Sequence, residues 1–151
     1  MQFYILRHAD ADTEAATDSA RTLSGKGVEQ AHKIAQFCSA HGIRPDVIFA
    51  SPLIRAQQTA KPVAKELSVP VTTARWLACG ARPGTILAGI GDASSVMLVG
   101  HEPDLGDFIA HLIGAPEGSI HVRKASLTLV GVPVPRKGGG RLEFSIPVRM
   151  M

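Results

Sequence analysis

A chain of 151 residues, 45% of them hydrophobic, is long enough to bury one core without help from disulfides or metals. The formal net charge of +3 is mild and the basic residues are scattered, which excludes the basic stripe typical of nucleic-acid binders. A mild positive charge suits an anionic substrate. We therefore expect a single domain over residues 1–151 and no nucleic-acid partner.

The cysteines and the N-terminal stretch indicate a reduced, cytoplasmic protein. Cys38 and Cys79 lie far apart, with no CxxC spacing and no second pair, so we expect neither a disulfide framework nor a zinc site. The N-terminal apolar stretch is too short for a signal peptide and is followed by acidic residues. No segment has the length needed to cross a membrane, so we expect no membrane partner.

The first predicted strand ends in a cation and an imidazole. Residues 2–6 are β-branched, aromatic or apolar and predict a buried strand, which delivers Arg7 and His8 to a polar stretch over 9–22. That stretch is too irregular for a helix or strand and is long enough to be a functional loop. It contains the charged residues Asp18 and Arg21. Taken alone, an Arg-His pair at a strand end indicates only that the strand reaches water.

An amphipathic helix follows this loop. Ser24 can cap its start, and Gly42 can end it. Its apolar residues recur at spacings of three and four and are Val28, Ala31, Ile34, Ala35 and Cys38. This pattern predicts a helix that packs on a sheet.

A second buried strand leads directly into a second helix. The strand is predicted over 46–50, and Ser51 and Pro52 have the pattern of an N-cap followed by a proline in the first turn. The helix should continue to about Leu67. Arg55 then lies one turn from the cap, near the carboxyl end of the strand.

The second half of the chain continues to alternate between strands and helices. In order, we expect an exposed strand over 69–77, a short helix over 85–88, a buried strand over 95–100, a helix through Ile113 and a hairpin over 126–132 and 141–146. The buried strand ends at His101. Strands that alternate with helices in this way imply an open, mostly parallel α/β sheet, to which the hairpin adds an antiparallel part.

Three of the basic residues should meet at one edge of this sheet. In open α/β sheets, ligands bind beyond the carboxyl ends of the strands, where we place His8, His101 and Arg55. Guanidinium groups and a helix N-terminus bind phosphate oxygens. A neutral histidine can attack phosphorus, and charge neutralisation assists the transfer. The sequence therefore predicts a phosphate pocket.

Three motifs in this order carry a resemblance to a known family. They are Leu-Arg-His-Ala at 6–9, Ser-Pro-Leu-Ile-Arg-Ala-Gln-Gln-Thr-Ala at 51–60 and Val-Gly-His-Glu-Pro at 99–103. Their order and placement resemble the histidine phosphatase superfamily, which includes cofactor-dependent phosphoglycerate mutases. The small size and the segment 17–21 look most like the SixA-type phosphohistidine phosphatases. The resemblance extends over nearly the whole chain.

The resemblance implies both a fold and a set of site residues. The fold is a phosphoglycerate mutase-like three-layer α/β sandwich with a mostly parallel sheet, a C-terminal antiparallel hairpin and no helical cap insertion. His8 would be the nucleophile. The phosphate, or a sulfate in its place, would be bound by Arg7, Arg21, Arg55 and His101. The reaction would need no cofactor and no metal.

This chain departs from the family pattern at two places. Ala9 stands where the best-known pattern has glycine, which is tolerated if the backbone there does not need a positive φ. The segment 77–81 has no carboxylate, although mutase-like relatives place a proton-donating glutamate there. Asp18 and Glu102 are the available general acids or bases, with a slight preference for Asp18. For both, a surface or helix-start carboxylate is the alternative.

Other polar residues have simpler interpretations. The remaining histidines lack metal-binding spacing and are His32, His41, His111 and His121. Ser51 is interpreted as a helix cap, because no G-x-S-x-G elbow surrounds it. Five basic residues form either a rim that steers an acidic partner or a solvated face, and they are Arg123, Lys124, Arg136, Lys137 and Arg141.

The predicted function is a metal-independent phosphatase that forms a phosphohistidine intermediate on His8. Its expected partner is a phosphohistidine-bearing protein, either a signalling phosphotransfer domain or a phosphocarrier. The missing acid favours this substrate, because an imidazole leaving group can be protonated by solvent, whereas an alkoxide needs a proton donor. A small-molecule phosphomonoesterase is one alternative. A phosphoprotein-binding module without turnover is another.

Overall fold

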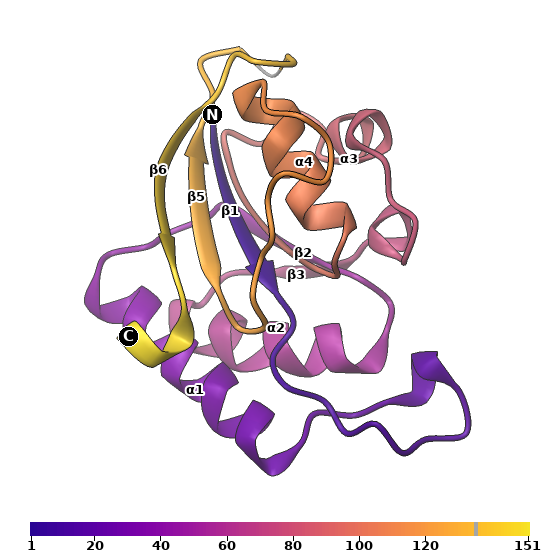
Figure 1. Ribbon diagram of the computed structural model, residues 1–151. Coiled ribbons are helices and arrows are strands. Elements are labelled where there is room, and N and C mark those ends of the chain that lie inside the picture. The colour runs from indigo at the N-terminus through magenta and orange to yellow at the C-terminus, as the bar shows by residue number, and fades with distance from the viewer. Residues whose placement is uncertain (135) are drawn as a thin grey trace.

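The computed structural model describes residues 1–134 and 136–151 and contains a six-stranded mixed sheet (Figure 1). The strands are β1 (Gln2–Arg7), β2 (Val47–Ala50), β3 (Val71–Thr73), β4 (Ser95–Gly100), β5 (Leu127–Gly131) and β6 (Arg141–Ile146). Their order across the sheet is β3-β2-β4-β1-β5-β6. The first four strands in this order are parallel, and β5 and β6 add the predicted antiparallel hairpin.

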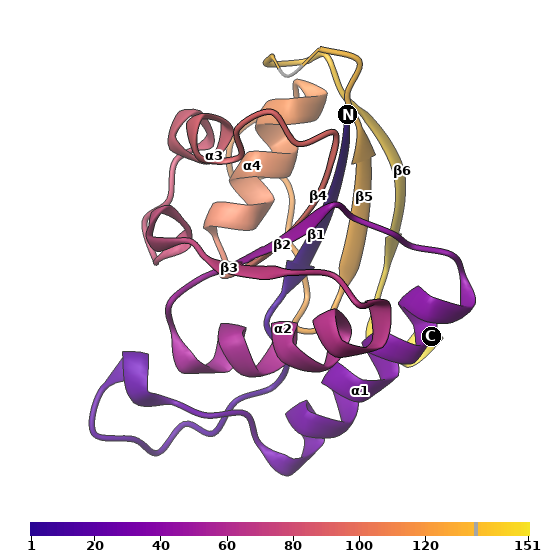
Figure 2. The same cartoon turned by 180° about the vertical axis from the view of Figure 1, so that it is seen from behind.

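Helices cover both faces of the sheet, which gives three layers. The α-helices are α1 (Gly25–Ala40), α2 (Ile54–Leu67), α3 (Pro83–Gly89) and α4 (Asp104–Ile113). Helices α1 and α2 lie side by side on one face, and α3 and α4 lie on the other (Figures 1 and 2). Between β3 and β4 the chain forms only a short 3-10 turn and the seven-residue α3, so no long helical cap covers the site. The predicted fold is confirmed.

Strand β1 is central because both of its faces are buried. Tyr4 and Leu6 pack in the core cluster of α1 and α2, whereas Phe3 and Ile5 pack in the cluster of α4 and α3. A strand covered on both faces has a continuous apolar sequence, which explains why it could be recognised. Its parallel neighbour β4 is buried in the same way.

Some predicted boundaries were wrong. Helix α2 begins at Ile54 with Leu53 as its N-cap, not at Ser51, and the predicted strand over 69–77 is limited to Val71–Thr73. Strand β3 is at the edge of the sheet and pairs only with β2, so the chain leaves it early in a 3-10 turn. Val28, expected on the buried face of α1, is 44% exposed.

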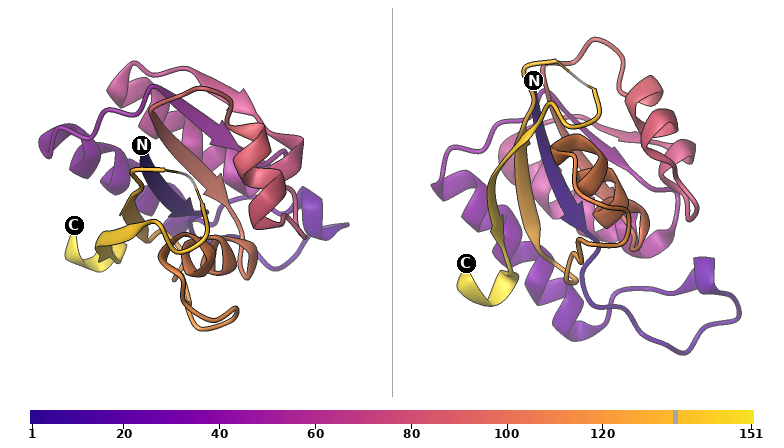
Figure 3. Two further views of the ribbon diagram at one scale, coloured as in Figure 1. Left: turned by 90° about the horizontal axis from the view of Figure 1, so that it is seen from above. Right: turned by 45° about the horizontal axis from the view of Figure 1, so that its top comes forward.

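The polar loop after β1 extends away from the sheet as a long excursion (Figure 3). It contains a 3-10 turn over Asp18–Ala20, whose start is capped by the side chain of Thr17. A bridge between Ala11 and Leu23 ties its two ends together. The loop is therefore anchored at its base, while residues 12–19 are exposed. Within the described residues, none of the helices combines the length and apolar character required to cross a membrane.

Candidate active site

The carboxyl ends of β1 and β4 bring two histidines together. Arg7 and Gly100 are partners in the parallel ladder, so His8 and His101 follow them side by side. The backbone N–H of His8 donates to the carbonyl of Gly100 at 3.1 Å. The two imidazole centroids are 5.2 Å apart, and both side chains are almost fully buried.

Arg55 joins this pair from the start of α2. Its side chain is 4% exposed, and its Nε lies 3.3 Å from Nε2 of His8. Arg7 reaches the same edge from the end of β1. Its Nη1 donates to the carbonyl of Val122 at 2.9 Å, while its Nε is buried without a partner among the described residues. An unpaired guanidinium N–H can donate to an arriving anion.

The contacts of His8 determine which of its nitrogens is free. Its Nδ1 lies 2.7 Å from the carbonyl oxygen of Ala9, and a carbonyl only accepts, so Nδ1 carries the proton. Nε2 then holds the lone pair and faces Arg55. Burial, opposed by the bond to Ala9 and assisted by Arg55 and Arg7, lowers the pKa of His8 to about 4. Near pH 7 the ring is therefore neutral and can act as a nucleophile at Nε2.

The backbone after His8 is compatible with alanine. The N–H of Ala9 donates to Oγ1 of Thr59 at 3.0 Å, and Thr59 in turn donates to the carbonyl of Arg55 at 2.7 Å. Ala9 does not have a positive φ. The departure from glycine therefore causes no strain, and Thr59, which sequence reasoning missed, ties the loop after His8 to α2.

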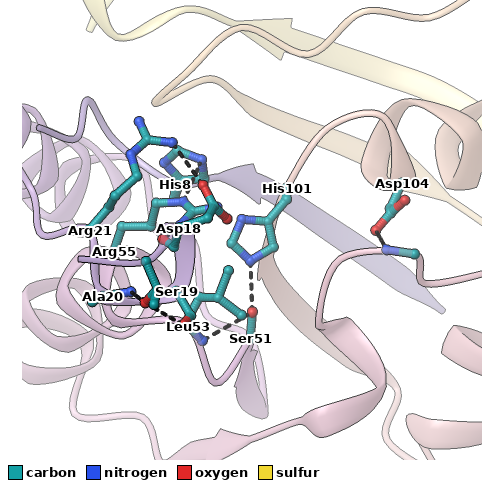
Figure 4. A network of polar contacts seen from close by, with 12 residues as sticks. His8, Asp18, Ser19, Ala20, Arg21, Ser51, Leu53, Arg55, His101 and Asp104 are labelled. Carbon is teal, nitrogen blue, oxygen red and sulfur yellow. Dashed lines mark hydrogen bonds and ion pairs between the residues drawn. The ribbon is translucent and has the colours of Figure 1, made fainter. Parts of the chain in front are cut away.

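Ser51 is the other functional neighbour that sequence reasoning missed. It does not cap α2 as predicted: the N-cap residue is Leu53, without a side-chain cap bond. Instead, Oγ of Ser51 lies 2.7 Å from Nε2 of His101 (Figure 4). The Ser-Pro pair gave a helix-start pattern that concealed this role. The available signal was that Ser51 follows a strand end, as His8 and His101 do.

Asp18 connects Arg21 to the buried group, which consists of His8, Arg55 and His101. Its Oδ2 pairs with Nη2 of Arg55 and its Oδ1 with Nη1 of Arg21, each at 3.1 Å, and its carbonyl accepts from Nη1 of Arg55 at 2.7 Å (Figure 4). Hydrogen bonds from Arg21 and then Arg55 lower the pKa of Asp18 below its usual value. Asp18 is therefore an ionised carboxylate and occupies donors that were expected to bind phosphate.

Glu102 has the opposite environment. Its Oε1 accepts from the N–H of Gly106 at 2.9 Å, and its Oε2 lies 3.7 Å from Nδ1 of the exposed His121. Burial raises the pKa of Glu102, although the backbone N–H groups of Val122 and Gly106, and after them Arg7, oppose the rise. In the described structure no side-chain hydrogen bond links Glu102 to His8, Arg55 or His101. Its resting position is that of a cap on the first turn of α4.

A carboxylate does reach the segment 77–81, but from α4. Oδ2 of the buried Asp104 accepts from the N–H groups of Gly80 and Ala81 at 2.7 and 2.9 Å. Figure 4 shows this side chain turned toward that segment and away from His101. Asp104 therefore anchors the loop through Oδ2 and is turned away from the histidines.

The five basic residues expected to form either a steering rim or a solvated face do not form one surface. Lys124 pairs with Asp10 at 3.0 Å. It lies near the site, as shown by the contact of the neighbouring Val122 with Arg7. Lys137 and Arg141 belong to the β5–β6 hairpin, whose turn contacts the end of α4 through the bond from Gly138 to His111. These basic groups lie at opposite ends of the sheet, which disagrees with a single steering rim.

Two cavities lie outside the group formed by His8, Arg55 and His101. One of about 380 Å³ lies on the loop and is lined by Thr13, Ala15, Ala16, Thr17, Asp18 and Arg21. Another of about 480 Å³ lies between the segment 80–83 and α4, where Asp104 is part of its wall. Over residues 1–134 and 136–151, no group of three or more His, Cys, Asp or Glu side chains is arranged to hold a metal ion.

Several known proteins of similar sequence or structure are phosphatases. The model of the histidine phosphatase superfamily (branch 1) matches residues 3–78. The phosphohistidine phosphatase SixA of Escherichia coli is 29% identical over 154 residues, which cover 97% of this chain and 93% of that protein.

Solved structures show the same fold. The protein histidine phosphatase SixA complexed with tungstate has a TM-score of 0.87 at 24% identity, covering 99% of this chain and 98% of that one. The alpha-ribazole phosphatase of Shigella flexneri has a TM-score of 0.75 at 18% identity, covering 95% of each chain. At these identities the structural matches establish the fold alone.

Proposed function

The chain belongs to the histidine phosphatase superfamily (branch 1) and is a phosphatase, and we propose that it hydrolyses phosphohistidine in a protein through a phosphoenzyme intermediate on His8. The observation that carries the proposal is the state of His8. Its ring is neutral, its Nε2 lone pair is directed toward Arg55, and Arg7, Arg55 and His101 surround it. The name of the E. coli relative supports the substrate class.

In the first step, Nε2 of His8 attacks phosphorus while the bond from phosphorus to the substrate's imidazole nitrogen breaks. The leaving imidazole takes a proton from solvent. Arg7 and Arg55 neutralise the charge on the phosphoryl oxygens, which is the main contribution a protein makes to this transfer. The donors of Arg55 are engaged by Asp18 in the resting state, so the incoming phosphate replaces that carboxylate.

In the second step, water attacks the phosphorus carried by His8, and inorganic phosphate leaves. Asp18 is the ionised carboxylate available to accept the proton of this water. Its hydrogen bonds to Arg21 and Arg55 lower its pKa and weaken it as a base, and the incoming phosphate removes the contact with Arg55. Because of this low pKa, Asp18 is a poor acid for the first step. Glu102 has a raised pKa and holds its proton more readily than Asp18 does. Its side chain, however, is bonded to the first turn of α4.

Two further observations support a phosphoprotein substrate. The segment 77–81 has no carboxylate of its own, and Asp104 uses its oxygen to hold that segment, so an alkoxide leaving group finds no ready proton donor there. The loop over 12–19 is exposed and lies beside the site through the contact of Asp18 with Arg55, so it can contact a protein substrate. We propose that the partner is a cytoplasmic phosphotransfer domain or phosphocarrier protein.

The alternative is a small-molecule phosphomonoesterase. The structural likeness to the alpha-ribazole phosphatase of S. flexneri is the observation that favours it. Such a reaction would need Glu102 to turn from Gly106 toward the leaving oxygen. A binding module without turnover is less well supported, since His8 is held neutral with an unprotonated Nε2.

The test is a comparison of kcat/KM on a histidine-phosphorylated phosphocarrier, a histidine-phosphorylated phosphotransfer domain, p-nitrophenyl phosphate and phosphoglycerate. We expect at least one phosphohistidine protein to exceed both esters by about a hundredfold, with no loss of rate in excess chelator. Faster turnover of an ester than of both phosphoproteins contradicts the substrate class. His8→Asn serves as the blank in every assay.

A further inference from the structure

Ser51 follows β2 directly, at the sheet edge that carries His8 and His101, and its side chain is fully buried. Its Oγ lies 2.7 Å from Nε2 of His101, which is only 3% exposed. Figure 4 shows the imidazole of His101 between Ser51 on one side and His8 with Asp18 on the other. The Ser51 hydroxyl therefore contacts the far side of a histidine in the phosphate pocket.

The hydrogen bonds of Ser51 determine where the shared proton lies. The backbone N–H of Leu53 donates to Ser51 Oγ at 3.3 Å, so this oxygen already accepts one bond. The hydroxyl hydrogen also needs an acceptor, because a buried O–H without one is unfavourable. Among the described residues, Nε2 of His101 is the acceptor bonded to this hydroxyl. Ser51 then donates, and Nε2 carries no proton.

The opposite nitrogen of His101 points to the same arrangement. Burial, and after it the neighbouring His8 and Arg55, lowers the pKa of His101 to about 3, so the ring is neutral near pH 7 and carries one proton. With Nε2 bare, that proton is on Nδ1. In the part of the chain that the structure describes, Nδ1 is buried and has no partner. It is a donor that an arriving phosphate oxygen would satisfy.

The other tautomer leaves more groups unsatisfied. If Nε2 donated to Ser51, the hydroxyl hydrogen would lack an acceptor and Nδ1 would present a bare lone pair. A lone pair repels a phosphate oxygen, whereas an N–H attracts it. Both the hydrogen-bond pattern and the charge of the ligand therefore favour the Nδ1–H form.

We infer that Ser51 is a positioning residue that holds His101 as the Nδ1–H tautomer, so that this ring donates a hydrogen bond to the substrate's phosphate. The inference rests on the proposed function in one respect, since it takes phosphate to be the ligand. Ser51 itself touches neither phosphorus nor the leaving group. It acts through the histidine, as residues behind a ligating histidine do at metal sites.

The tautomer can be measured without any substrate, by two-bond ¹H–¹⁵N NMR correlation on protein labelled with ¹⁵N-histidine. We expect a protonated Nδ1 and a bare Nε2 on His101 in the wild type. A protonated Nε2 overturns the inference. Saturating inorganic phosphate should shift the Nδ1 resonance of His101, and an unchanged resonance overturns its role as a phosphate donor.

Ser51→Thr and Ser51→Val form a matched pair, because both add the same methyl group and only threonine keeps the hydroxyl. We expect Ser51→Thr to keep the tautomer. Ser51→Val should lose it and lower kcat/KM on p-nitrophenyl phosphate relative to Ser51→Thr by roughly tenfold to a hundredfold. Equal tautomers and equal rates in the pair contradict the inference.

Two controls separate this role from general effects. Thr128→Val removes another buried hydroxyl, one that pairs with Ser145 at 2.8 Å in the β5–β6 hairpin, and should leave the His101 spectrum unchanged. If the Ser51 variants do not fold, the wild-type tautomer and its response to phosphate still decide the question. If the protein hydrolyses no phosphohistidine, the proposed function fails while these readouts continue to test Ser51.

Discussion

The site joins two regions with unlike surroundings. At the sheet edge, His8, Arg55 and His101 are at most 5% exposed and are held by strand ends and a helix start. On the loop, the Asp18 side chain is 62% exposed and the Arg21 side chain 22%. Charges and hydrogen bonds are strong in a buried site and weak at an exposed one. We therefore expect the chemistry to depend on the sheet edge and to be adjusted by the loop.

The largest expected effect is at the sheet edge. Arg55→Lys keeps a positive charge but loses the fork that contacts His8 and Asp18 together, so kcat/KM should fall by about a hundredfold or more. Arg44→Lys, at an exposed arginine before β2, is the matched control and should change the rate little. A loss of less than threefold in Arg55→Lys would contradict the central role of the buried group.

A smaller effect is expected on the loop. Asp18→Asn removes the charge that competes with phosphate for Arg55, so inorganic phosphate should inhibit the variant more strongly, by about fivefold at most for an exposed ion pair. The rate of dephosphorylation should fall as well, if Asp18 activates water. Asp12→Asn is the control, because only the carbonyl of Asp12 contacts Arg21. Weaker inhibition by phosphate would show that Asp18 supports the phosphate site.

The same contrast explains what the sequence could and could not predict. Strand ends that carry Arg7, His8 and His101 were recognisable because continuous apolar runs mark buried parallel strands. The contact between Asp18 and Arg55 joins residues 37 positions apart. It depends on the path of an irregular loop, whose sequence has no periodicity from which that path could be predicted. Glu102 was named as an acid or base from its place in the chain, with a helix-start carboxylate as the alternative, and its bond to Gly106 in the first turn of α4 fits that alternative.

Ser51 shows a different limit. A serine before a proline at a strand end fits a helix cap by local rules, and only the neighbouring strand β4 brings His101 within reach. The length of the edge strand β3 was also overestimated. This strand pairs only with β2, and the chain turns away from the sheet soon after Thr73. Local patterns thus identified buried elements well, and they missed contacts between elements.

The smallest expected effect is a change of stability with pH. It should depend on the buried histidines and not on the exposed ones. Burial lowers the pKa values of His8 and His101 to about 4 and about 3, so the unfolded chain binds protons first as pH falls below about 6.5. The free energy of unfolding should therefore fall between pH 6.5 and pH 4, by about 1 to 2 kcal/mol per histidine at pH 5. Urea unfolding at pH 7 and pH 5 measures it.

Two variants serve as the comparison for this pH dependence. His8→Asn should reduce the loss of stability between pH 7 and pH 5, because one buried titrating group is gone. His32→Asn, at an exposed histidine of α1, should leave that loss unchanged. An equal loss in the wild type and in His8→Asn would mean that His8 is not held neutral by burial.

The most direct measurement of the central claim is the position of the phosphate on the enzyme during turnover. A reaction with a ³²P-labelled phosphohistidine protein is quenched in alkali, where phosphohistidine survives, and the labelled residue is mapped by mass spectrometry and NMR. We expect acid-labile phosphate on Nε2 of His8 and none on the His8→Asn variant. Phosphate that remains on His8→Asn, or an acid-stable phosphate on Ser51, would contradict the assignment of His8 as the nucleophile.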